Sequence, residues 1–261
     1  MDYLIICGVA LFVSGLTFIS GFGLGTLLMP AFALFFPLPV AIGATAIVHL
    51  VNNLFKVGLI GGKADRSVVV RFAVPGFFLA ILGAYVLGLL EGSPPINQYN
   101  LAGKQFEISQ VNLIVGILII IFALFDLLPA LSKLQLDKRH IVLGGALSGF
   151  FGGLSGHQGA LRTTFLIKFG LEKEVFIATG IVSAVIVDVG RLLIYGAAFY
   201  SHRFEYVESG LIPLVVAASL SAFAGAYAGR QILKKVTFRS IQILIGILLI
   251  LVGSGLASGI L

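Results

Sequence analysis

Seven apolar stretches recur along this chain, and each is long enough to cross a lipid bilayer as a helix. They lie near residues 3–20, 39–61, 68–90, 110–131, 174–196, 209–229 and 240–260. Hydrophobic residues make up 59% of the chain and charged residues only 11%, whereas a soluble domain is about half apolar and a quarter charged. The sequence therefore predicts an all-α polytopic membrane protein. Because the stretches recur throughout, the first is not a lone signal peptide.

The polar composition narrows the possible partners. The single cysteine, Cys7, excludes an internal disulfide and a cysteine-based metal cluster. The net charge of +6 reports membrane orientation before it reports binding partners, because Lys and Arg residues in the loops set the topology of a membrane protein. We expect the lipid bilayer as a partner and no nucleic acid, cofactor or metal. The sequence does not indicate an oligomeric state.

An internal repeat organises the chain. Shifting the sequence by 134 residues aligns 14–62 with 148–196 without a gap, and 13 of the 49 positions are identical. Apolar sequences often match by chance, but the shared glycines and the Thr45/Thr179 pair are not explained by apolarity. We infer two homologous halves, 1–134 and 135–261, within one integrated transmembrane domain. Each half has a glycine-broken apolar segment, 3–36 or 141–170, followed by three ordinary helices.

The broken segments decide the topology. If each crosses the membrane once, the repeats are parallel and the loops hold seven basic residues on either side. If each is a re-entrant hairpin, the repeats are inverted, and the loops on one face hold twelve Lys and Arg against Lys104 and Arg203 opposite. The second distribution is the one that the positive-inside rule expects. We favour two inverted repeats, each a re-entrant or broken helical hairpin plus three transmembrane helices, with both termini outside.

The hairpin tips would be SGFGLGT at 20–26 and LSGHQGALR at 154–162. Irregular backbone at membrane depth is tolerated only where protein buries it or where it lines a cavity. Each tip leads into a helix whose N-terminus offers free N–H groups and the positive end of the helix dipole. Two such ends facing each other predict an anion-binding site.

Polar side chains near these tips are the candidates for substrate binding. One face of the predicted helix over 39–61 carries Thr45, His49, Asn52 and Lys56, with Asn53 alongside. The candidate substrate-binding residues are Gly25, Thr26, Thr45, His49, Asn52, Ser155, His157, Gln158, Gly159, Arg162, Thr179 and Ser183. For His49 and Asn52 the alternative is a hydrogen bond to a neighbouring helix. For Arg162 it is a structural link, and for Lys56 it is a side chain that snorkels to the membrane surface.

Asp188 and Arg191 are three residues apart on one predicted helix and could pair across a turn, with a neutralised structural ion pair as the favoured interpretation. Proton-coupled transport would require titratable groups within reach of the cavity. The candidates are His49, His157 and Asp188, and the sequence does not choose among them.

An enzymatic alternative rests on Gly153-Leu154-Ser155-Gly156, which matches the GxSG motif of rhomboid intramembrane proteases. Such a protease needs a histidine base on a later membrane helix. After His157 the only histidine is His202, in a predicted outside loop. Because Ser155 aligns with Gly21 in the repeat, the duplicated feature is the glycine turn and not a nucleophile. We keep the intramembrane serine protease as a remote alternative.

The paired motifs resemble those of the TauE/SafE family of membrane transporters. The first half has SGFGLGTLLMP followed by AIGATA, and the second has GLSGHQGALR followed by IATG. The resemblance covers nearly the whole chain. It implies a bacterial inner-membrane exporter of sulfite or of organosulfonate anions such as sulfoacetate, and not an enzyme. The second tip departs from the family's glycine-proline-glycine style, and its extra donors could select another oxyanion or a carboxylate-bearing sulfonate.

From the sequence we expect alternating-access transport of a small sulfur-containing anion at a site between the two tips, either with or without proton coupling. An anion channel for small oxyanions with the same pore is the main alternative.

Overall fold

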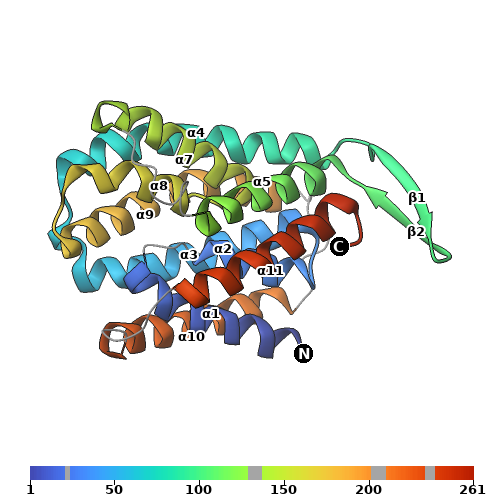
Figure 1. Ribbon diagram of the computed structural model, residues 1–261, viewed down its shortest axis with the longest axis horizontal. Helices are drawn as coiled ribbons and strands as arrows, with labels where there is room; N and C mark the ends of the chain where they lie inside the picture. Colours follow the sequence, from blue (N-terminus) through green and yellow to red (C-terminus); the bar gives the residue numbers. More distant parts are fainter. Residues whose placement is uncertain (21–23, 129–136, 201–209, 233–238) are drawn as a thin grey trace.

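The computed structural model describes residues 1–20, 24–128, 137–200, 210–232 and 239–261. The chain forms an elongated bundle in which the long helices lie side by side (Figure 1). The helices are α1 Asp2–Ser20, α2 Gly25–Ala33, α3 Leu38–Ile60, α4 Arg66–Glu91, α5 Gln110–Leu127, α7 Ile141–Ser155, α8 Gly159–Leu166, α9 Lys173–Tyr200, α10 Leu211–Ile232 and α11 Arg239–Ser258, with short 3₁₀ turns η1 Gly61–Lys63, η2 Lys138–His140 and η3 Ile167–Phe169.

Four helices of the described chain are long and apolar enough to cross a bilayer. They correspond to α3, α4, α9 and α10, and parts of α1, α5 and α11 are apolar but shorter. The predicted all-α polytopic membrane fold is therefore confirmed. Predicted loop residues Lys133, Arg203, Lys234 and Lys235 lie outside the described residues, as does His202.

A β-hairpin projects from one end of the bundle (Figure 1), in a part of the chain between two of the predicted apolar stretches. Strand β1 Asn97–Leu101 pairs antiparallel with β2 Lys104–Ile108. Ala102 and Gly103 turn the chain with φ values of 50° and 78°, as a type I′ turn requires. The Tyr99 ring stacks on Phe106, and the Tyr99 hydroxyl donates to the Ser258 carbonyl at 2.7 Å, which ties the hairpin to the end of α11.

The first broken segment folds as a helical hairpin. Helix α1 runs parallel to α3, because Ser14 Oγ lies 3.1 Å from Asn52 Oδ1 and Thr17 Oγ1 lies 2.9 Å from Lys56 Nζ. Helix α2 leads into α3 through a short turn and so runs in the opposite direction to α1. Of the predicted tip, residues 21–23 lie outside the described chain.

The second broken segment folds in the same way. A Cβ placed on Gly152 would contact the Gln158 side chain, and one on Gly144 would contact the Phe165 ring, so α8 runs back along α7. Helix α7 ends at Gly156, whose φ of +80° is in the left-handed region that glycine adopts without strain.

The two hairpins enter the bundle from opposite ends. Helices α4 and α7 run parallel, because Gly145 packs against Phe72 and Gly153 against Ala80. Since α4 returns antiparallel to α3, the first helices of the two hairpins, α1 and α7, point in opposite directions. Helices α2 and α8 begin at Gly25 and Gly159, which are equivalent in the sequence repeat. This is the arrangement that inverted repeats require; the repeat itself stays a prediction.

Glycines let neighbouring backbones touch along two helix pairs. On α7, a Cβ at Gly145, Gly149 or Gly153 would lie 1.9 to 2.1 Å from a carbonyl oxygen of α4. On α10, a Cβ at Gly225 or Gly229 would lie 2.0 to 2.4 Å from a carbonyl oxygen of α1. Small residues at such positions are how membrane helices gain close packing.

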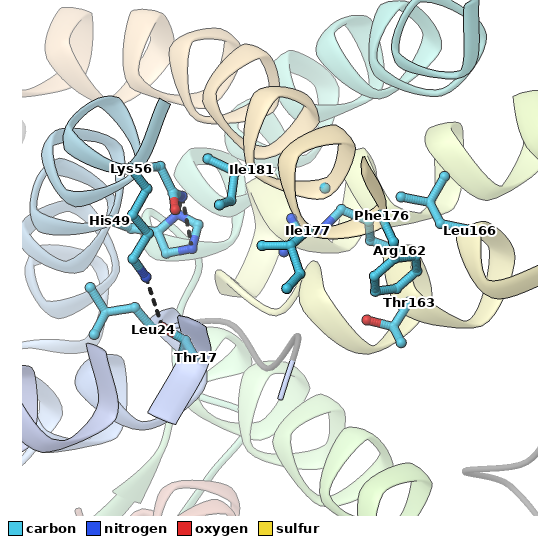
Figure 2. A pocket seen from close by; sticks show the side chains of 12 residues that line it. Thr17, Leu24, His49, Lys56, Arg162, Thr163, Leu166, Phe176, Ile177 and Ile181 are labelled. Carbon is cyan, nitrogen blue, oxygen red and sulfur yellow. Dashed lines mark hydrogen bonds between the residues drawn. The ribbon is translucent and has the colours of Figure 1, made fainter. Parts of the chain in front are cut away.

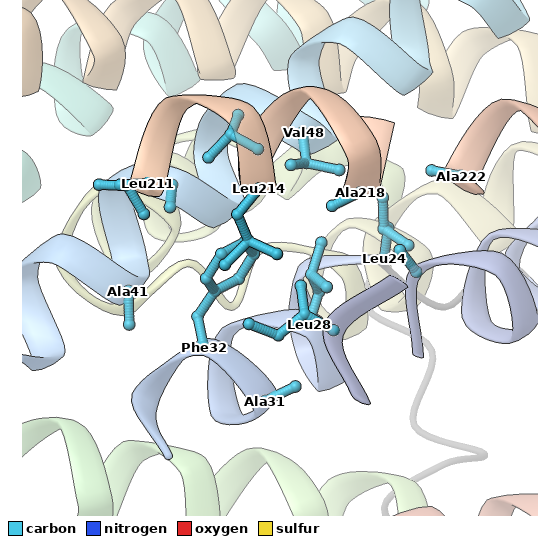
Figure 3. Packing of buried hydrophobic residues seen from close by; sticks show 14 of the residues in the cluster. Leu24, Leu28, Ala31, Phe32, Ala41, Val48, Leu211, Leu214, Ala218 and Ala222 are labelled. Atoms are coloured by element: carbon cyan, nitrogen blue, oxygen red, sulfur yellow. The ribbon is translucent and has the colours of Figure 1, made fainter. Parts of the chain in front are cut away.

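An apolar cluster holds the first hairpin in place (Figure 3). Leu24, Leu28 and Phe32 on and beside α2 pack among residues of α1, α3 and α10, including Val48 and Leu214. In the second hairpin, Phe165 and Leu166 of α8 join a smaller cluster with residues of α4 and α7. The short helix of the first hairpin is therefore packed in an apolar environment.

Candidate functional site

A pocket of about 480 Å³, including its open mouth, lies between the two hairpins (Figure 2). It is bounded by the end of α1, the start of α2, the second half of α3, helix α8 and the first half of α9. Its lining residues are Thr17, Leu24, His49, Asn53, Lys56, Arg162, Thr163, Leu166, Phe176, Ile177, Gly180 and Ile181. The pocket thus takes residues from both halves of the chain.

Two basic side chains face this pocket, and no Asp or Glu is among the described residues that line it. Lys56 comes from α3 of the first half and Arg162 from α8 of the second, and their exposed fractions are only 3% and 8%. Buried cations away from water gain strongly from an anionic partner. The pocket is therefore suited electrostatically to an anion.

Lys56 is held from the first half of the chain. Its Nζ donates to Thr17 Oγ1 at 2.9 Å. When the Asn52 amide is oriented so that both its ends are satisfied, Asn52 accepts from Lys56 Nζ at 3.1 Å and donates to the Ala222 carbonyl at 3.3 Å. Lys56 thus points inward beside α1 and does not snorkel away from the bundle.

Arg162 is held from the second half. Its Nη1 lies 3.4 Å from Gln158 Oε1, and Gln158 Nε2 donates to Asp188 Oδ1 at 2.9 Å. Within the described chain, Arg162 has no carboxylate within 4.0 Å. Its charge is therefore not cancelled by direct contact with an acid.

Asp188, fully buried on α9, ties the second hairpin to the rest of the bundle. Its Oδ1 accepts from Arg191 Nε at 3.0 Å and Nη2 at 2.6 Å. Arg191 in turn donates through Nη1 to the Gly152 carbonyl near the end of α7, at 3.1 Å. Tyr195 donates to the neighbouring Gly153 carbonyl. The predicted partners Asp188 and Arg191 are thus in contact, within a larger network.

His49 joins this network to the pocket. Its Nδ1 lies 2.6 Å from Asp188 Oδ2, a contact that links α3 of the first half to α9 of the second. The imidazole also lines the pocket (Figure 2), and Asn53 Nδ2 lies 3.1 Å from its Nδ1. Among the described residues that line the pocket, His49 is therefore the side chain that contacts the buried acid directly.

The two hairpin tips meet at Gly25 and Gly156, which are not among the residues that line the pocket. A Cβ on Gly25 would lie 3.2 Å from the Gly156 carbonyl oxygen and 3.7 Å from Thr45 Cγ2. Three buried polar atoms have no hydrogen-bond partner among the described residues: Thr45 Oγ1, His157 Nε2 and Ser183 Oγ. None of these three side chains lines the pocket.

Several other predicted site residues serve local structure. Ser155 Oγ donates to the Phe151 carbonyl at 3.0 Å, and His157 Nδ1 contacts the Ser155 carbonyl at 2.9 Å. The His157 ring stacks on Phe122 of α5. Thr179 Oγ1 accepts from the Asp65 amide at 2.9 Å, so its hydroxyl supports the turn before α4.

The pocket brings together only two of the predicted substrate-binding residues, His49 and Arg162. Gly25, Thr26, Gly159, Gln158 and Asn52 lie behind it or beside it without lining it. Sequence reasoning did not include Thr17, Asn53, Lys56 and Thr163 among its candidates. For Asn53 and Lys56 a signal was present, because they continue the polar stripe that contains His49.

The described residues contain no group of three or more His, Cys, Asp or Glu side chains that could hold a metal ion. The chemistry of the pocket is that of cationic and neutral hydrogen-bond donors. Such a set can bind, orient and release an anion.

The family of this chain follows from its sequence similarity to known families. The chain matches the sulfite exporter TauE/SafE family over residues 4–256, which is nearly its full length. It belongs to the TauE/SafE family. Members of this family are membrane transporters, and the apolar helices of this chain fit a multi-pass TauE/SafE protein. A search of curated proteins gave no match.

Proposed function

We propose that this TauE/SafE protein exports a small sulfur-containing anion, either sulfite or an organosulfonate such as sulfoacetate, by alternating access. The observation that carries the proposal is the pocket between the hairpins, which has Lys56 from one half and Arg162 from the other, with no acid among the lining residues that the structure describes. The family supplies the class of substrate, and the pocket supplies a place to bind it.

The pocket offers donors for several oxygens of one anion. The Arg162 guanidinium can donate two parallel hydrogen bonds to a sulfonate or sulfite group, and Lys56 adds a compact charge. The hydroxyls of Thr17 and Thr163 lie in the same lining. These groups would replace the water that the anion loses on entering, which a wholly apolar pocket could not do.

The position of the pocket favours a carrier over a channel. An anion there would contact Lys56 on α3 of the first half and Arg162 on the hairpin of the second half, and so would relieve the repulsion between these two cations. The remaining wall is largely apolar, with Leu24, Leu166 and Phe176 among its residues. Bound anion would thus draw the halves together, and its release would let them part, as in transporters built from inverted repeats.

The starts of the two short helices, α2 and α8, also contribute to the proposed anion site. Leu24, the residue before α2, and Arg162, in the first turns of α8, both line the pocket. We propose that the positive ends of these two short helices add to the potential of the pocket from behind. The backbone amides near Gly25 and Gly159 would then act at a distance.

The experiment is a binding and transport screen on the purified protein. Sulfite, sulfate, thiosulfate, sulfoacetate, taurine and simple carboxylates are tested for binding by calorimetry, and the ligands that bind are tested for flux in liposomes. A carrier gives saturable exchange, whereas a channel passes current far faster than a carrier can cycle. Failure of every sulfur anion to bind would contradict the proposed substrate class.

We further propose a bacterial inner-membrane location with both termini outside. In support, the N- and C-terminal ends lie toward the end of the bundle from which the β-hairpin projects (Figure 1). Introduced cysteines near 97–105 should react with an impermeant thiol reagent added from outside, and those near 137–139 should not. The reverse labelling pattern would overturn the orientation.

A further inference from the structure

His49 combines two contacts that no other described residue combines. It lines the pocket with Lys56 and Arg162, and it contacts Asp188 in the buried network. Histidine is also the side chain whose charge ordinarily changes between about pH 5 and 8. A change of protonation at His49 would therefore alter the charge of the pocket wall directly.

The contacts of Asp188 fix where the first imidazole proton lies. Arg191 and Gln158 approach Oδ1 with groups that can only donate, so Asp188 accepts on that side as an ionised carboxylate. Oδ2 then accepts from His49 Nδ1 at 2.6 Å. The neutral imidazole therefore carries its proton on Nδ1, and Nε2 has the lone pair.

The second ring nitrogen has an adaptable neighbour. Asn53 Nδ2 lies 3.1 Å from His49 Nδ1 and 3.3 Å from Nε2. Because Nδ1–H is directed at Asp188, Nε2 is the ring nitrogen that keeps its lone pair, and the Asn53 amide lies within 3.3 Å of it. A rotation of the Asn53 amide would present its oxygen instead, which could accept from a protonated Nε2. Asn53 can thus serve both charge states of the ring.

The charged groups around His49 link its protonation to anion binding. Lys56 lies on the same helix, Arg162 on α8, and Asp188 with Arg191 on α9; the described parts of α1, α2 and α10 that pack here contribute no acid or base to the pocket. With the pocket vacant, Lys56 and Arg162 oppose a third positive charge. A bound anion removes that opposition, so anion and proton each favour binding of the other.

We propose that His49 binds a proton at Nε2 when the anion enters the pocket, so that the protein moves a proton together with each anion. The proton comes from solvent, forms the Nε2–H bond, and leaves when the pocket opens on the other side. Asn53 and Asp188 are positioning residues for this step. The inference rests on the proposed function, because it uses the same pocket and the same anion.

The test is calorimetric titration of sulfite and, separately, of sulfoacetate into the purified protein near pH 7.5, in two buffers with different heats of ionisation. Sulfoacetate does not itself change protonation in this range. The difference in binding heat between the two buffers gives the number of protons taken up with each anion, and we expect about one proton per sulfoacetate.

Two variants separate this site from other histidines. His49→Gln should lose the proton uptake while Lys56 and Arg162 still bind the anion. His157→Gln is the matched control, because His157 is equally buried but lies outside the pocket lining, and it should keep the uptake of the unmodified protein.

The outcomes are distinct. Anion binding without any dependence on the buffer, in the unmodified protein, would overturn the proton proposal and leave the proposed function intact. Uptake that survives in His49→Gln would also overturn it. Absence of binding by both anions would remove the proposed function and this inference with it.

Discussion

The two hairpins have the same backbone plan and different chemistry. In the α1–α2 hairpin, the short helix carries Leu28 and Phe32 into an apolar cluster. In the α7–α8 hairpin, the equivalent short helix carries Arg162, and Gln158 before it binds Asp188. The two hairpins therefore share their backbone turns, whereas only the second one has a cationic side chain, Arg162, among the described residues that line the pocket.

In the first half of the chain, most of the polar pocket residues come from α3 and not from the short helix of the hairpin. Lys56, His49 and Asn53 all come from α3, which follows the apolar hairpin. The equivalent helix of the second half, α9, instead contributes mainly apolar lining and the buried pair of Asp188 with Arg191. The pocket is therefore asymmetric although its supporting hairpins correspond.

The largest expected effect comes from breaking the polar attachment of the second hairpin. Asp188→Asn keeps the side-chain shape but leaves the fully buried Arg191 without its anion. We expect the free energy of unfolding to fall by about 3–5 kcal/mol, measured by denaturation of the purified protein in detergent. Glu174→Gln is the control, because its pair with Lys63 is exposed and contributes at most about 1 kcal/mol. Equal stability losses in the two variants would contradict the role of Asp188.

Removing the cation of the second hairpin should affect binding most. Arg162→Ala deletes charge-assisted hydrogen bonds to the anion, so the sulfite dissociation constant should rise by about 10- to 150-fold. Calorimetry on folded protein measures it. Lys168→Ala, which removes the same charge from an exposed position just beyond α8, should leave the affinity nearly unchanged. An unchanged affinity in Arg162→Ala would remove this residue from the site.

The cation of the first half should matter less, because Lys56 is a single charge that Thr17 also holds. Lys56→Met, which keeps the length of the side chain, should weaken sulfite binding by about 10-fold. The comparison variant is Lys63→Met at the end of the same segment, where the lysine is exposed. If Lys56→Met and Lys63→Met bind alike, the pocket depends on one hairpin alone.

The smallest effect distinguishes the two turns themselves. Gly156→Ala places a Cβ on a residue with φ of +80° and should cost about 1–2 kcal/mol of stability. Gly25 has no positive φ, and its Cβ would only approach the Gly156 carbonyl at 3.2 Å, so Gly25→Ala should cost less. Gly58→Ala, with open space around it, should be nearly neutral. Thermal unfolding of the three variants ranks them, and a reversed order would contradict the turn geometry.

Much of the fold could be predicted from the sequence, because hydropathy alone locates membrane helices and the 134-residue offset locates both broken segments. The starts of α2 and α8 at Gly25 and Gly159 fall at equivalent positions of the repeat. The β-hairpin was missed because its two strands are short and mostly polar, so they look like a linker. Its fold depends on the Ala102-Gly103 turn and on Tyr99 stacking against Phe106.

The site could be predicted only in part. A buried arginine in a membrane segment is a strong signal, and Arg162 does line the pocket. Repeat symmetry was a poorer guide to side chains: Thr179 supports the Asp65 amide, whereas the Thr45 hydroxyl has no partner in the described part of the chain. Thr17 lines the pocket because α1 extends along α3 as far as Lys56. A local sequence pattern does not encode this packing of two helices.

The most direct test of the account is the affinity of sulfite and sulfoacetate for the unmodified protein and for the double variant Lys56→Met, Arg162→Ala. The account predicts saturable binding of at least one of these anions by the unmodified protein, and loss of that binding in a double variant that remains folded. Binding that is equally tight in both proteins would contradict the claim that a cation from each half holds the anion between the two hairpins.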